Sequence, residues 1–428
     1  MVPKPAPHSA DPKADPSPRI ALAHDWLVGL RGGELVLDAI VRTLAPIARI
    51  GPIFTMFDNR EPLTPAIDAL PRRASSLNRT PDRARRWLLP AYPAAVAQLS
   101  RKLARAHARD PFDLLISTSS SAIKNLRPPQ GLPHLCYCHA PARYLWTRTD
   151  EYADASPLHA LGLRAAGPAL RAWDRRATRH ITALLANSTH IQREIARVYH
   201  RESAVLHPPV RTHTFTPAHT PTNTPANTPA NTPREAFWLV VSALEPYKRV
   251  DLAIEAALLA AVELRIAGQG SRAADLRRFA DERARAAGHA NAQAAGIRFL
   301  GRVSDADLID LYRRARLLLF TQIEDFGIVA VEAQACGCPV VARAEGGAID
   351  TVRAPTAGAF FNSPTPAAVA EAARTIDQHD PKTLATAARA NAERFAEHAF
   401  NEGLLRAARA LCPKLTSAPA APVSRPPP

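Results

Sequence analysis

Short apolar runs alternate with longer segments of mixed polarity along most of this chain, a pattern typical of alternating strands and helices. The clearest run is Leu317–Phe320, four consecutive apolar residues that predict a strand buried on both faces. Similar runs predict strands at 19–23, 113–117, 134–138, 181–186, 204–206, 237–242, 263–267, 297–300, 339–342 and 356–362, with helices at 34–44, 191–199, 251–261, 272–287, 328–336 and 366–376. We therefore predict an α/β protein in which two doubly wound, Rossmann-like domains face each other across a cleft.

Chain length and proline content set the expected domain boundaries. At 428 residues the chain is long enough for two domains with separate cores. The segment THTFTPAHTPTNTPANTPANTPR has proline at nearly every fourth position, which excludes helix and sheet and predicts a solvated linker. The expected parts are a disordered tail at 1–18, a first domain at 19–211, this linker at 212–234, a second domain at 235–390, a C-terminal helix at 391–412 and a disordered tail at 413–428.

The net charge of +15 indicates an anionic partner, which could be a phosphorylated ligand, an anionic membrane or a nucleic acid. The arginines are dispersed, and no zinc-finger or aromatic RNA-binding motif occurs, so nucleic acid is disfavoured. No run approaches 18 apolar residues and the first residues lack an apolar core, so we expect a cytoplasmic protein. The basic, partly apolar segment 81–109 fits either a surface helix with one buried stripe or a helix lying on an anionic membrane.

Five cysteines include two C-x-C pairs, Cys136/Cys138 and Cys336/Cys338. Metal-binding pairs usually have at least two residues between the cysteines, so buried reduced thiols are the favoured interpretation. The D-x-D string after Ser304 could also indicate a metal, but Ser304 with an acid three residues later is better explained as a helix cap. No metal or other cofactor is expected.

The stretch EDFGIVAVEAQACGCPVVARAEGG, 324–347, combines a buried strand before it, a turn at its start and a short helix that stops at Gly337. The helix then begins at the carboxyl edge of a parallel sheet, where free N–H groups suit a phosphate. Glu324 and Glu332 are eight residues apart and can lie on the order of 10 Å from each other. Isolated glutamates are usually solvated surface residues, but the surrounding turn and helix stop make this pattern more specific.

Three further segments carry candidate chemistry. Gly32 and Gly33 precede a predicted helix, where glycine allows a phosphate to approach the backbone. His139 directly follows a predicted parallel strand and would face the crevice, although a structural histidine is the ordinary alternative. Lys248 and Arg249 lie in a strand-to-helix loop, where cations can clamp a diphosphate.

Four segments in order resemble retaining glycosyltransferases of the GT-B fold, family 4: HDWLVGLRGGE at 24–34, YCHAPARYLW at 137–146, PYKRVDLAIEA at 246–256 and EDFGIVAVEAQACGCPV at 324–340. The resemblance covers roughly residues 19–410 apart from the linker, and implies a GT-B protein whose C-terminal helix crosses back to the first domain. The form of these motifs looks most like the mannosyltransferase branch that builds bacterial surface polysaccharide.

The resemblance also implies roles for individual residues. Glu324 would hold sugar hydroxyls, Glu332 the nucleotide ribose, and His139 would contact the transferring sugar or diphosphate, which makes His139 and Glu324 the catalytic candidates. The implied donor-binding residues are Gly32, Gly33, Lys248, Arg249, Phe326, Gly327, Ile328 and Glu332, and the implied acceptor-binding residues are Asp25 and Arg143. One departure stands out: the family commonly has arginine where this chain has Ala243, so one expected cation is missing.

The predicted function is transfer of a hexose to a glycan or lipid-linked acceptor. The first donor expected is GDP-mannose, which would supply mannose. The expected partners are a nucleotide sugar, that acceptor and, as an open alternative, the inner face of an anionic membrane. Two rival classes are a non-catalytic nucleotide-sugar-binding relative, motivated by Ala243, and a basic membrane- or nucleic-acid-binding module, motivated by the net charge. A glycosidase that uses Glu324 and Glu332 is less favoured, because nothing in the pattern requires an activated water between them.

Overall fold

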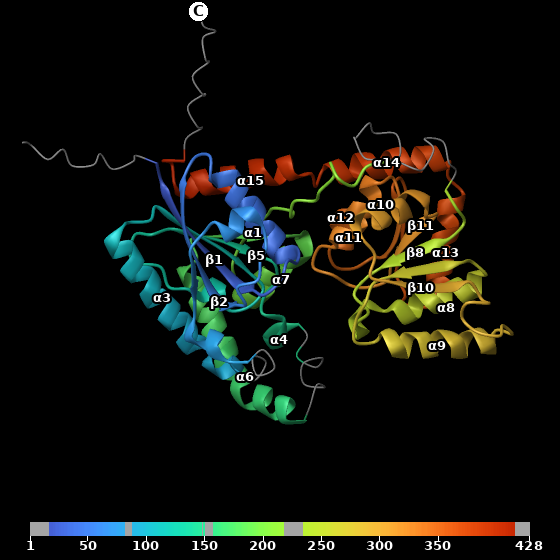
Figure 1. Cartoon of the computed structure of the whole chain (residues 1–428), viewed down its shortest axis with the longest axis horizontal. Coiled ribbons are helices and arrows are strands. Elements are labelled where there is room, and N and C mark those ends of the chain that lie inside the picture. The colour runs from blue at the N-terminus through green and yellow to red at the C-terminus, as the bar shows by residue number, and fades with distance from the viewer. Residues whose placement is uncertain (1–16, 82–87, 148, 150–156, 218–233, 416–428) are drawn as a thin grey trace, which may run out of the picture.

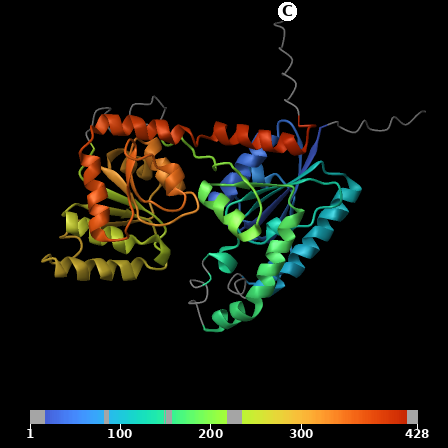
Figure 2. The ribbon, with the colours of Figure 1, turned by 180° about the vertical axis from the view of Figure 1, so that it is seen from behind.

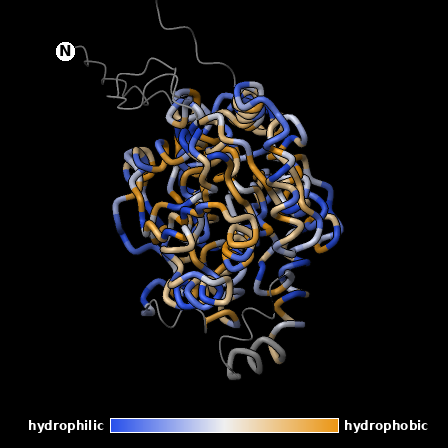
Figure 3. The backbone as a smooth tube through the Cα atoms, turned by 90° about the vertical axis from the view of Figure 1, so that its right-hand side faces the viewer, coloured by the Kyte–Doolittle hydropathy of each residue, from blue (hydrophilic) through white to orange (hydrophobic). Residues whose placement is uncertain are grey.

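A computed structural model describes residues 17–81, 88–147, 149, 157–217 and 234–415, with two lobes side by side (Figure 1). Most of the proline-rich linker, most of both predicted tails and part of the basic segment at 81–109 lie outside these residues. Within them no helix has both the length and the apolarity needed to cross a membrane. In Figure 3 hydrophobic stretches run through the middle of the tube and hydrophilic ones mark much of its outline, as burial of apolar side chains requires.

The first lobe is built on a seven-stranded parallel sheet in the order β3-β2-β1-β4-β5-β6-β7. Its strands are β1 (Arg19–Leu27), β2 (Arg49–Asp58), β3 (Arg72–Ala74), β4 (Leu114–Ser119), β5 (His134–Cys138), β6 (Ala183–Ala186) and β7 (Ala204–Val205). Its helices are α1 (Gly32–Leu44), α2 (Pro65–Asp68), α3 (Tyr92–Arg109), α4 (Arg143–Trp146), α6 (Pro157–Ala177) and α7 (Thr189–Tyr199), with short 3₁₀ turns η1 (Ser76–Arg79), η3 (Ile123–Asn125) and η4 (Thr178–His180).

The second lobe holds a six-stranded parallel sheet in the order β10-β9-β8-β11-β12-β13. Its strands are β8 (Trp238–Val241), β9 (Leu264–Ala267), β10 (Ile297–Gly301), β11 (Leu317–Phe320), β12 (Val340–Arg343) and β13 (Gly358–Phe361). Its helices are α8 (Val250–Ala260), α9 (Ala273–Ala286), α10 (Asp305–Arg314), α11 (Ile328–Ala335), α12 (Ala348–Thr351) and α13 (Pro366–Asp377), with the 3₁₀ turn η5 (Pro246–Lys248). The two doubly wound sheets confirm the predicted α/β fold class.

Two helices at the end of the chain connect the lobes: α14 (Pro381–Glu393) lies over the second and α15 (Glu397–Leu411) over the first, as both views show (Figures 1 and 2). Phe400 of α15 packs in the apolar core of the first lobe, with its ring centroid 5.9 Å from that of Tyr137. The chain also crosses between the lobes at Val210, whose N–H donates to the Phe395 carbonyl at 2.9 Å. The two crossings therefore run side by side.

The structure corrects one boundary that matters for the site. β1 continues to Leu27, four residues beyond the strand predicted at 19–23, because its outer part pairs in register with β2 up to Leu27 and Asp58. His24 and Asp25 are consequently buried strand residues and not part of a loop. The predicted cap of α10 is confirmed, since the Ser304 hydroxyl accepts a hydrogen bond from the Asp307 N–H at 3.2 Å. All five cysteine side chains are buried, as predicted.

Candidate functional site

Each sheet has one point where the strand order reverses, and the candidate residues gather at these two points. In the first sheet the reversal lies between β1 and β4, and in the second between β8 and β11. Loops diverge there at the carboxyl ends of the strands and leave a crevice that suits a ligand. The loop after β1 carries Gly32, while the loops after β8 and β11 carry Lys248 and Glu324.

The first-lobe half of the site is the N-terminus of α1 with His139 beneath it. Gly32 and Gly33 are the first two residues of that helix, which begins two residues before the predicted start at 34, and their N–H groups lie at a helix N-terminus that suits a phosphate. A Cβ atom built on Gly33 would lie 3.8 Å from His139 Nε2 and 3.3 Å from His24 Cε1, so both imidazoles pack directly against this glycine. The helix start and the two histidines therefore form one cluster.

His139 is held in the neutral form at its position after β5. Its Nε2 atom is buried and has no hydrogen-bond partner within the described part of the chain. Burial, with smaller contributions from His24 and the Arg143 guanidinium, lowers the pKa of His139 to about 3. A neutral imidazole nitrogen that faces the α1 start can accept or donate one hydrogen bond to a ligand hydroxyl or phosphate, depending on its tautomer.

A second polar pair under the same loop was missed by the sequence reasoning. His24 Nδ1 pairs with the Thr118 hydroxyl, and its Nε2 lies 3.8 Å from a Glu34 carboxylate oxygen. The other Glu34 oxygen accepts the Arg31 N–H at 3.1 Å, which ties the loop to the helix start. The signal was present in the sequence, because Glu34 stands at the position where a capping acid is expected, but β1 was predicted to be too short to bring His24 beneath it.

Asp25 does not have the predicted role of contacting the acceptor. Its side chain is only 2% exposed, and one carboxylate oxygen accepts hydrogen bonds from the N–H groups of Ser120 and Ser121 at 2.7 and 2.8 Å. The same oxygen accepts from the Ser119 hydroxyl, and the other accepts the Ile123 N–H at 2.8 Å. A carboxylate with this many inward donors positions the loop after β4, so we correct its assignment to a positioning residue.

The second-lobe half is the loop from Glu324 to Gly327, which close backbone packing holds in place. The Gly347 N–H donates to the Glu324 carbonyl at 2.8 Å, and a Cβ on Gly347 would meet the Phe326 backbone at 2.4 Å. Gly327 caps α11 with a φ of +92°, and a Cβ there would meet the Phe320 ring at 2.8 Å. These positions need glycine for conformational and steric reasons, so the EDFG turn has one geometry.

Lys248 and Glu324 meet at the reversal point of the second sheet. The Lys248 ammonium pairs with a Glu324 carboxylate oxygen, which also accepts the Gln322 amide at 3.2 Å. The Thr321 hydroxyl donates to the Lys248 carbonyl at 3.1 Å and so fixes the lysine backbone against the end of β11. Arg249, in contrast, points to the Asp251 carboxylate at 3.1 Å on a partly exposed surface. The exposed Ala243 brings no charge to this loop.

Phe326 was predicted to bind the donor, and the structure places its side chain in the core. Its side chain is 4% exposed and packs with Phe395 at 5.5 Å and His207 at 5.6 Å between ring centroids. A ring buried among these neighbours anchors the loop against the core. Burial lowers the pKa of His207, which keeps that imidazole neutral in the aromatic cluster.

Three contacts join the two halves of the site. A Cβ on Gly32 would lie 3.5 Å from Ile328 Cδ1, so the N-termini of α1 and α11 face each other across the lobes. Arg143 of α4 forms an ion pair with Asp325, whose main-chain carbonyl accepts the Ser188 hydroxyl. The site thus brings Gly32, Gly33, His139 and Arg143 of one lobe close to the Glu324–Ile328 loop of the other.

Glu332 lies on α11, one turn after Ile328, on the side of α10 and the crossing segment. Burial raises the pKa of its carboxyl group to about 7, the Arg211 guanidinium lowers it in part, and Asp305 raises it. The folded protein therefore holds a proton on Glu332 at pH values where the unfolded chain has already lost it.

This shift predicts a pH-dependent stability difference for Glu332→Gln. Because the folded-state pKa is above the ordinary glutamate pKa of 4.5, the stability of the parent protein should fall as pH rises from about 4.5 to 7, whereas the variant lacks this loss. At pH 8 the variant should be more stable by roughly 1–3 kcal/mol, and at pH 4 by almost nothing. Thermal unfolding of both proteins at pH 4, 6 and 8 measures the difference, and equal shifts at all three values would contradict a proton held on Glu332 in the folded protein.

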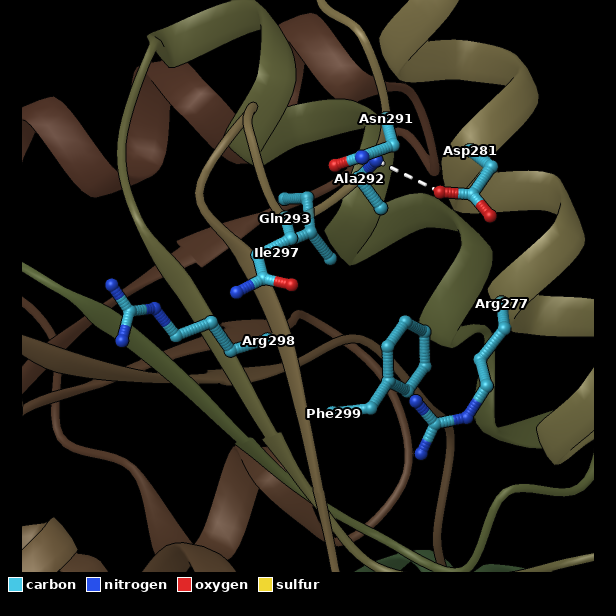
Figure 4. Close-up of a pocket in the computed structure, with 8 residues that line it drawn as sticks. All are labelled: Arg277, Asp281, Asn291, Ala292, Gln293, Ile297, Arg298 and Phe299. Carbon is cyan, nitrogen blue, oxygen red and sulfur yellow. Dashed lines mark hydrogen bonds between the residues drawn. The ribbon is translucent and has the colours of Figure 1, made fainter.

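A separate cavity of about 520 Å³ lies between α9 and β10 at the edge of the second sheet (Figure 4). It is lined by Arg277, Asp281, Asn291, Ala292, Gln293, Ile297, Arg298 and Phe299. The Arg277 guanidinium covers the Phe299 ring at 4.6 Å, and Asp281 accepts the Ala292 N–H at 2.9 Å. None of the predicted site residues lines this cavity, so it does not belong to the candidate site.

The second lobe is similar to a known protein family. Residues 227–394 match the model of the family described as glycosyl transferases group 1. The matched segment contains Lys248, Glu324 and Glu332, so the second half of the site lies within the part of the chain that is similar to this family.

Similarity to individual proteins extends this result. The chain is 33% identical to the D-inositol 3-phosphate glycosyltransferase of Mycolicibacterium gilvum (strain PYR-GCK) over 219 residues, 50% of this chain and 48% of that protein. A 35% identical stretch of 199 residues is shared with the protein of the same name from Mycobacterium sp. (strain KMS), covering 45% of this chain and 42% of that one. The chain therefore spans about half the length of the curated relatives it matches. The names of these relatives give no support to the predicted mannosyltransferase activity.

Solved structures match across nearly the whole chain. Anabaena Alr3699/HepE in complex with UDP has a TM-score of 0.66 at 18% identity, covering 92% of this chain and 100% of that one. Sucrose-phosphate synthase (tll1590) from Thermosynechococcus elongatus also gives 0.66, at 19% identity, covering 92% and 99%. At such identities the likeness shows the fold, and the two-lobed GT-B prediction is confirmed.

Proposed function

We propose that this chain is a retaining glycosyltransferase that moves a hexose from a nucleotide diphosphate sugar to an acceptor hydroxyl. The observation that carries the proposal is the meeting of Lys248 and Glu324 at the sheet reversal point, opposite the α1 N-terminus and His139. A diphosphate between two helix N-termini and a lysine gains electrostatic stabilisation as its bond to the sugar breaks. The similarity of residues 227–394 to the family described as glycosyl transferases group 1 supports the same activity.

The proposed reaction needs no covalent enzyme intermediate. The bond between the sugar anomeric carbon and the diphosphate oxygen breaks, and the leaving diphosphate keeps the electron pair. The acceptor oxygen bonds to the same face of that carbon, and its proton passes to the leaving phosphate. Lys248 and the two helix starts stabilise the departing charge, while Glu324 holds sugar hydroxyls and His139 the sugar or diphosphate.

The donor and acceptor are narrower proposals. GDP-mannose remains the first donor proposed from the form of the motifs, and UDP-glucose is the second, since Anabaena Alr3699/HepE has been solved with UDP-glucose. For the acceptor we propose a glycan or lipid-linked hydroxyl in surface polysaccharide synthesis at the membrane, with D-inositol 3-phosphate, named in the curated relatives, as the competing acceptor.

A donor screen tests this function. The full chain is incubated with GDP-, UDP-, ADP- and dTDP-sugars, each with and without D-inositol 3-phosphate, and thermal unfolding and release of nucleoside diphosphate are recorded. A donor at 100 times its Kd should stabilise the protein by about 2.7 kcal/mol, which raises Tm by a few degrees for a domain of this size. Glu324→Ala should reduce diphosphate release at least about tenfold.

Two outcomes would speak against this proposal. A nucleotide sugar could stabilise the parent protein and yet be neither hydrolysed nor transferred by it. That result would favour the non-catalytic, nucleotide-sugar-binding alternative, for which the uncharged and exposed Ala243 is the motivation. No stabilisation by any nucleotide sugar, together with binding to DNA at physiological salt, would instead favour the basic binding module.

A further inference from the structure

Three basic side chains that were predicted to bind the donor or the acceptor each face a carboxylate. Lys248 pairs with Glu324, Arg249 with Asp251, and Arg143 with Asp325. The first two pairs lie within the second lobe, whereas the third spans the two lobes. Of these three pairs, only Arg143–Asp325 has an acid that lies between the proposed sugar-binding residue Glu324 and the N-terminus of α11.

The Arg143–Asp325 pair is held at the mouth of the site. The Asp325 main-chain carbonyl accepts the Ser188 hydroxyl, which fixes the backbone of the loop against the start of α7. The side chains themselves are accessible, with 37% of Arg143 and 15% of Asp325 exposed to solvent. The partners of an accessible guanidinium can exchange while the backbone that presents the acid stays in place.

The position of this pair is one where an anion is favoured. Asp325 lies just before α11, whose first residue, Ile328, faces Gly32 at the start of α1. Helix N-termini attract negative charge, and a guanidinium binds carboxylate and phosphate through the same fork of donors. The Asp325 carboxylate therefore occupies a position that also suits a ligand phosphate.

We propose that Asp325 competes with the diphosphate of the donor for Arg143 and thereby sets the affinity of the cleft for nucleoside diphosphates. This inference rests on the proposed function, because it takes a nucleotide diphosphate as the ligand. Arg143 then contacts the donor, in addition to or in place of the acceptor contact predicted from sequence. It provides, from the first lobe, the positive charge that is missing from the second lobe because Ala243 stands where the family commonly has arginine. Asp325 is a positioning residue that acts through Arg143.

Competition of this kind has a measurable size. If Arg143 is free of Asp325 about one tenth of the time, the apparent affinity for a phosphate that needs Arg143 is lowered about tenfold. Asp325→Asn keeps the shape of the side chain and removes its charge, so it should tighten binding of UDP or GDP by roughly that factor. Binding of uridine or guanosine, which lack phosphate, should not change.

The test is isothermal titration of the full chain with UDP and with GDP. The variants are Asp325→Asn, Arg143→Ala, Arg143→Lys and the double variant Arg143→Ala/Asp325→Asn. Arg143→Ala should weaken binding, Arg143→Lys should weaken it less, and Asp325→Asn should have no further effect once Arg143 is gone. Thermal unfolding of each variant checks that it folds.

Asp350→Asn is the matched control. Asp350 is a second acid of the same lobe that reaches across to the first, where it accepts the Thr189 N–H at 2.6 Å and the Thr189 hydroxyl at 2.5 Å. Its replacement removes one negative charge between the lobes without touching Arg143, and nucleotide affinity should stay within about twofold.

Four results would overturn the inference. They are weaker or unchanged binding in Asp325→Asn, tightening that persists in the double variant, equal tightening in Asp350→Asn, and equal tightening for the phosphate-free nucleosides. Binding of UDP or GDP with any of these results leaves the proposed function standing. Failure of all variants and of the parent protein to bind either nucleotide would overturn both proposals together.

Discussion

Replacing Lys248 by alanine is expected to lower the rate of sugar transfer about 100- to 1,000-fold at saturating donor. The lysine stands at the reversal point of the second sheet, where its ammonium reaches the Glu324 carboxylate. In the proposed reaction that ammonium stabilises charge that develops only as the diphosphate leaves, so its loss should reduce kcat more than it raises KM.

The control for Lys248→Ala is Arg278→Ala, which removes a cation of the same lobe that lies on α9 and pairs with Asp275. Initial rates over a range of donor concentrations should give parent-like kcat and KM for this control. Lys248→Arg keeps the charge on a different geometry and should recover part of the rate. If Lys248→Ala changes KM alone, the lysine contributes uniform binding and not transition-state stabilisation.

The fold could be predicted from sequence because its determining signal is local. Apolar runs such as Leu317–Phe320 and His134–Cys138 gave strands at the predicted positions, since strands buried on both faces must be apolar throughout. The outer part of β1 failed that test because His24 and Asp25 interrupt the apolar run. Their polarity is tolerated in the strand because Thr118 and the loop after β4 satisfy both side chains.

The site was predictable only within each motif. The sequence drew attention to the helix starts near Gly32 and Ile328 and to the loops of Lys248 and Glu324, because glycine and charge mark such loops. It could not find Asp325 or Asp350 as partners of Arg143 and Thr189, which are 182 and 161 residues away along the chain. The burial of the Phe326 ring could not be predicted, because an aromatic residue beside a site motif gives no sign of whether its side chain faces a ligand or the core.

The second large effect is expected at Lys124, whose side chain is fully buried in the first lobe. Its ammonium lies 3.2 Å from an Asp174 carboxylate oxygen, and Asp174 also accepts hydrogen bonds from Asn125, Trp146 and Tyr199, each at 2.8 Å. Burial is the largest single effect and would lower the pKa of Lys124, but the attraction of Asp174, together with smaller contributions from Asp25, Cys136 and Cys138, raises that pKa, so the lysine is charged. The pair links η3, α6, α4 and α7 around one buried charge.

Lys124→Met is therefore expected to destabilise the first lobe by about 3–5 kcal/mol, because it leaves the Asp174 charge buried without its counter-ion. Urea unfolding followed by tryptophan fluorescence measures this, since four of the five tryptophans lie in the first 211 residues. Adding Asp174→Asn should recover part of the loss by removing the uncompensated charge.

Lys414→Ala, which breaks a lysine–aspartate pair with an exposed lysine, should change the unfolding midpoint little. A midpoint for Lys124→Met equal to that of Lys414→Ala would mean that water or a shifted side chain compensates Asp174, and the buried pair would then not determine the stability of this lobe.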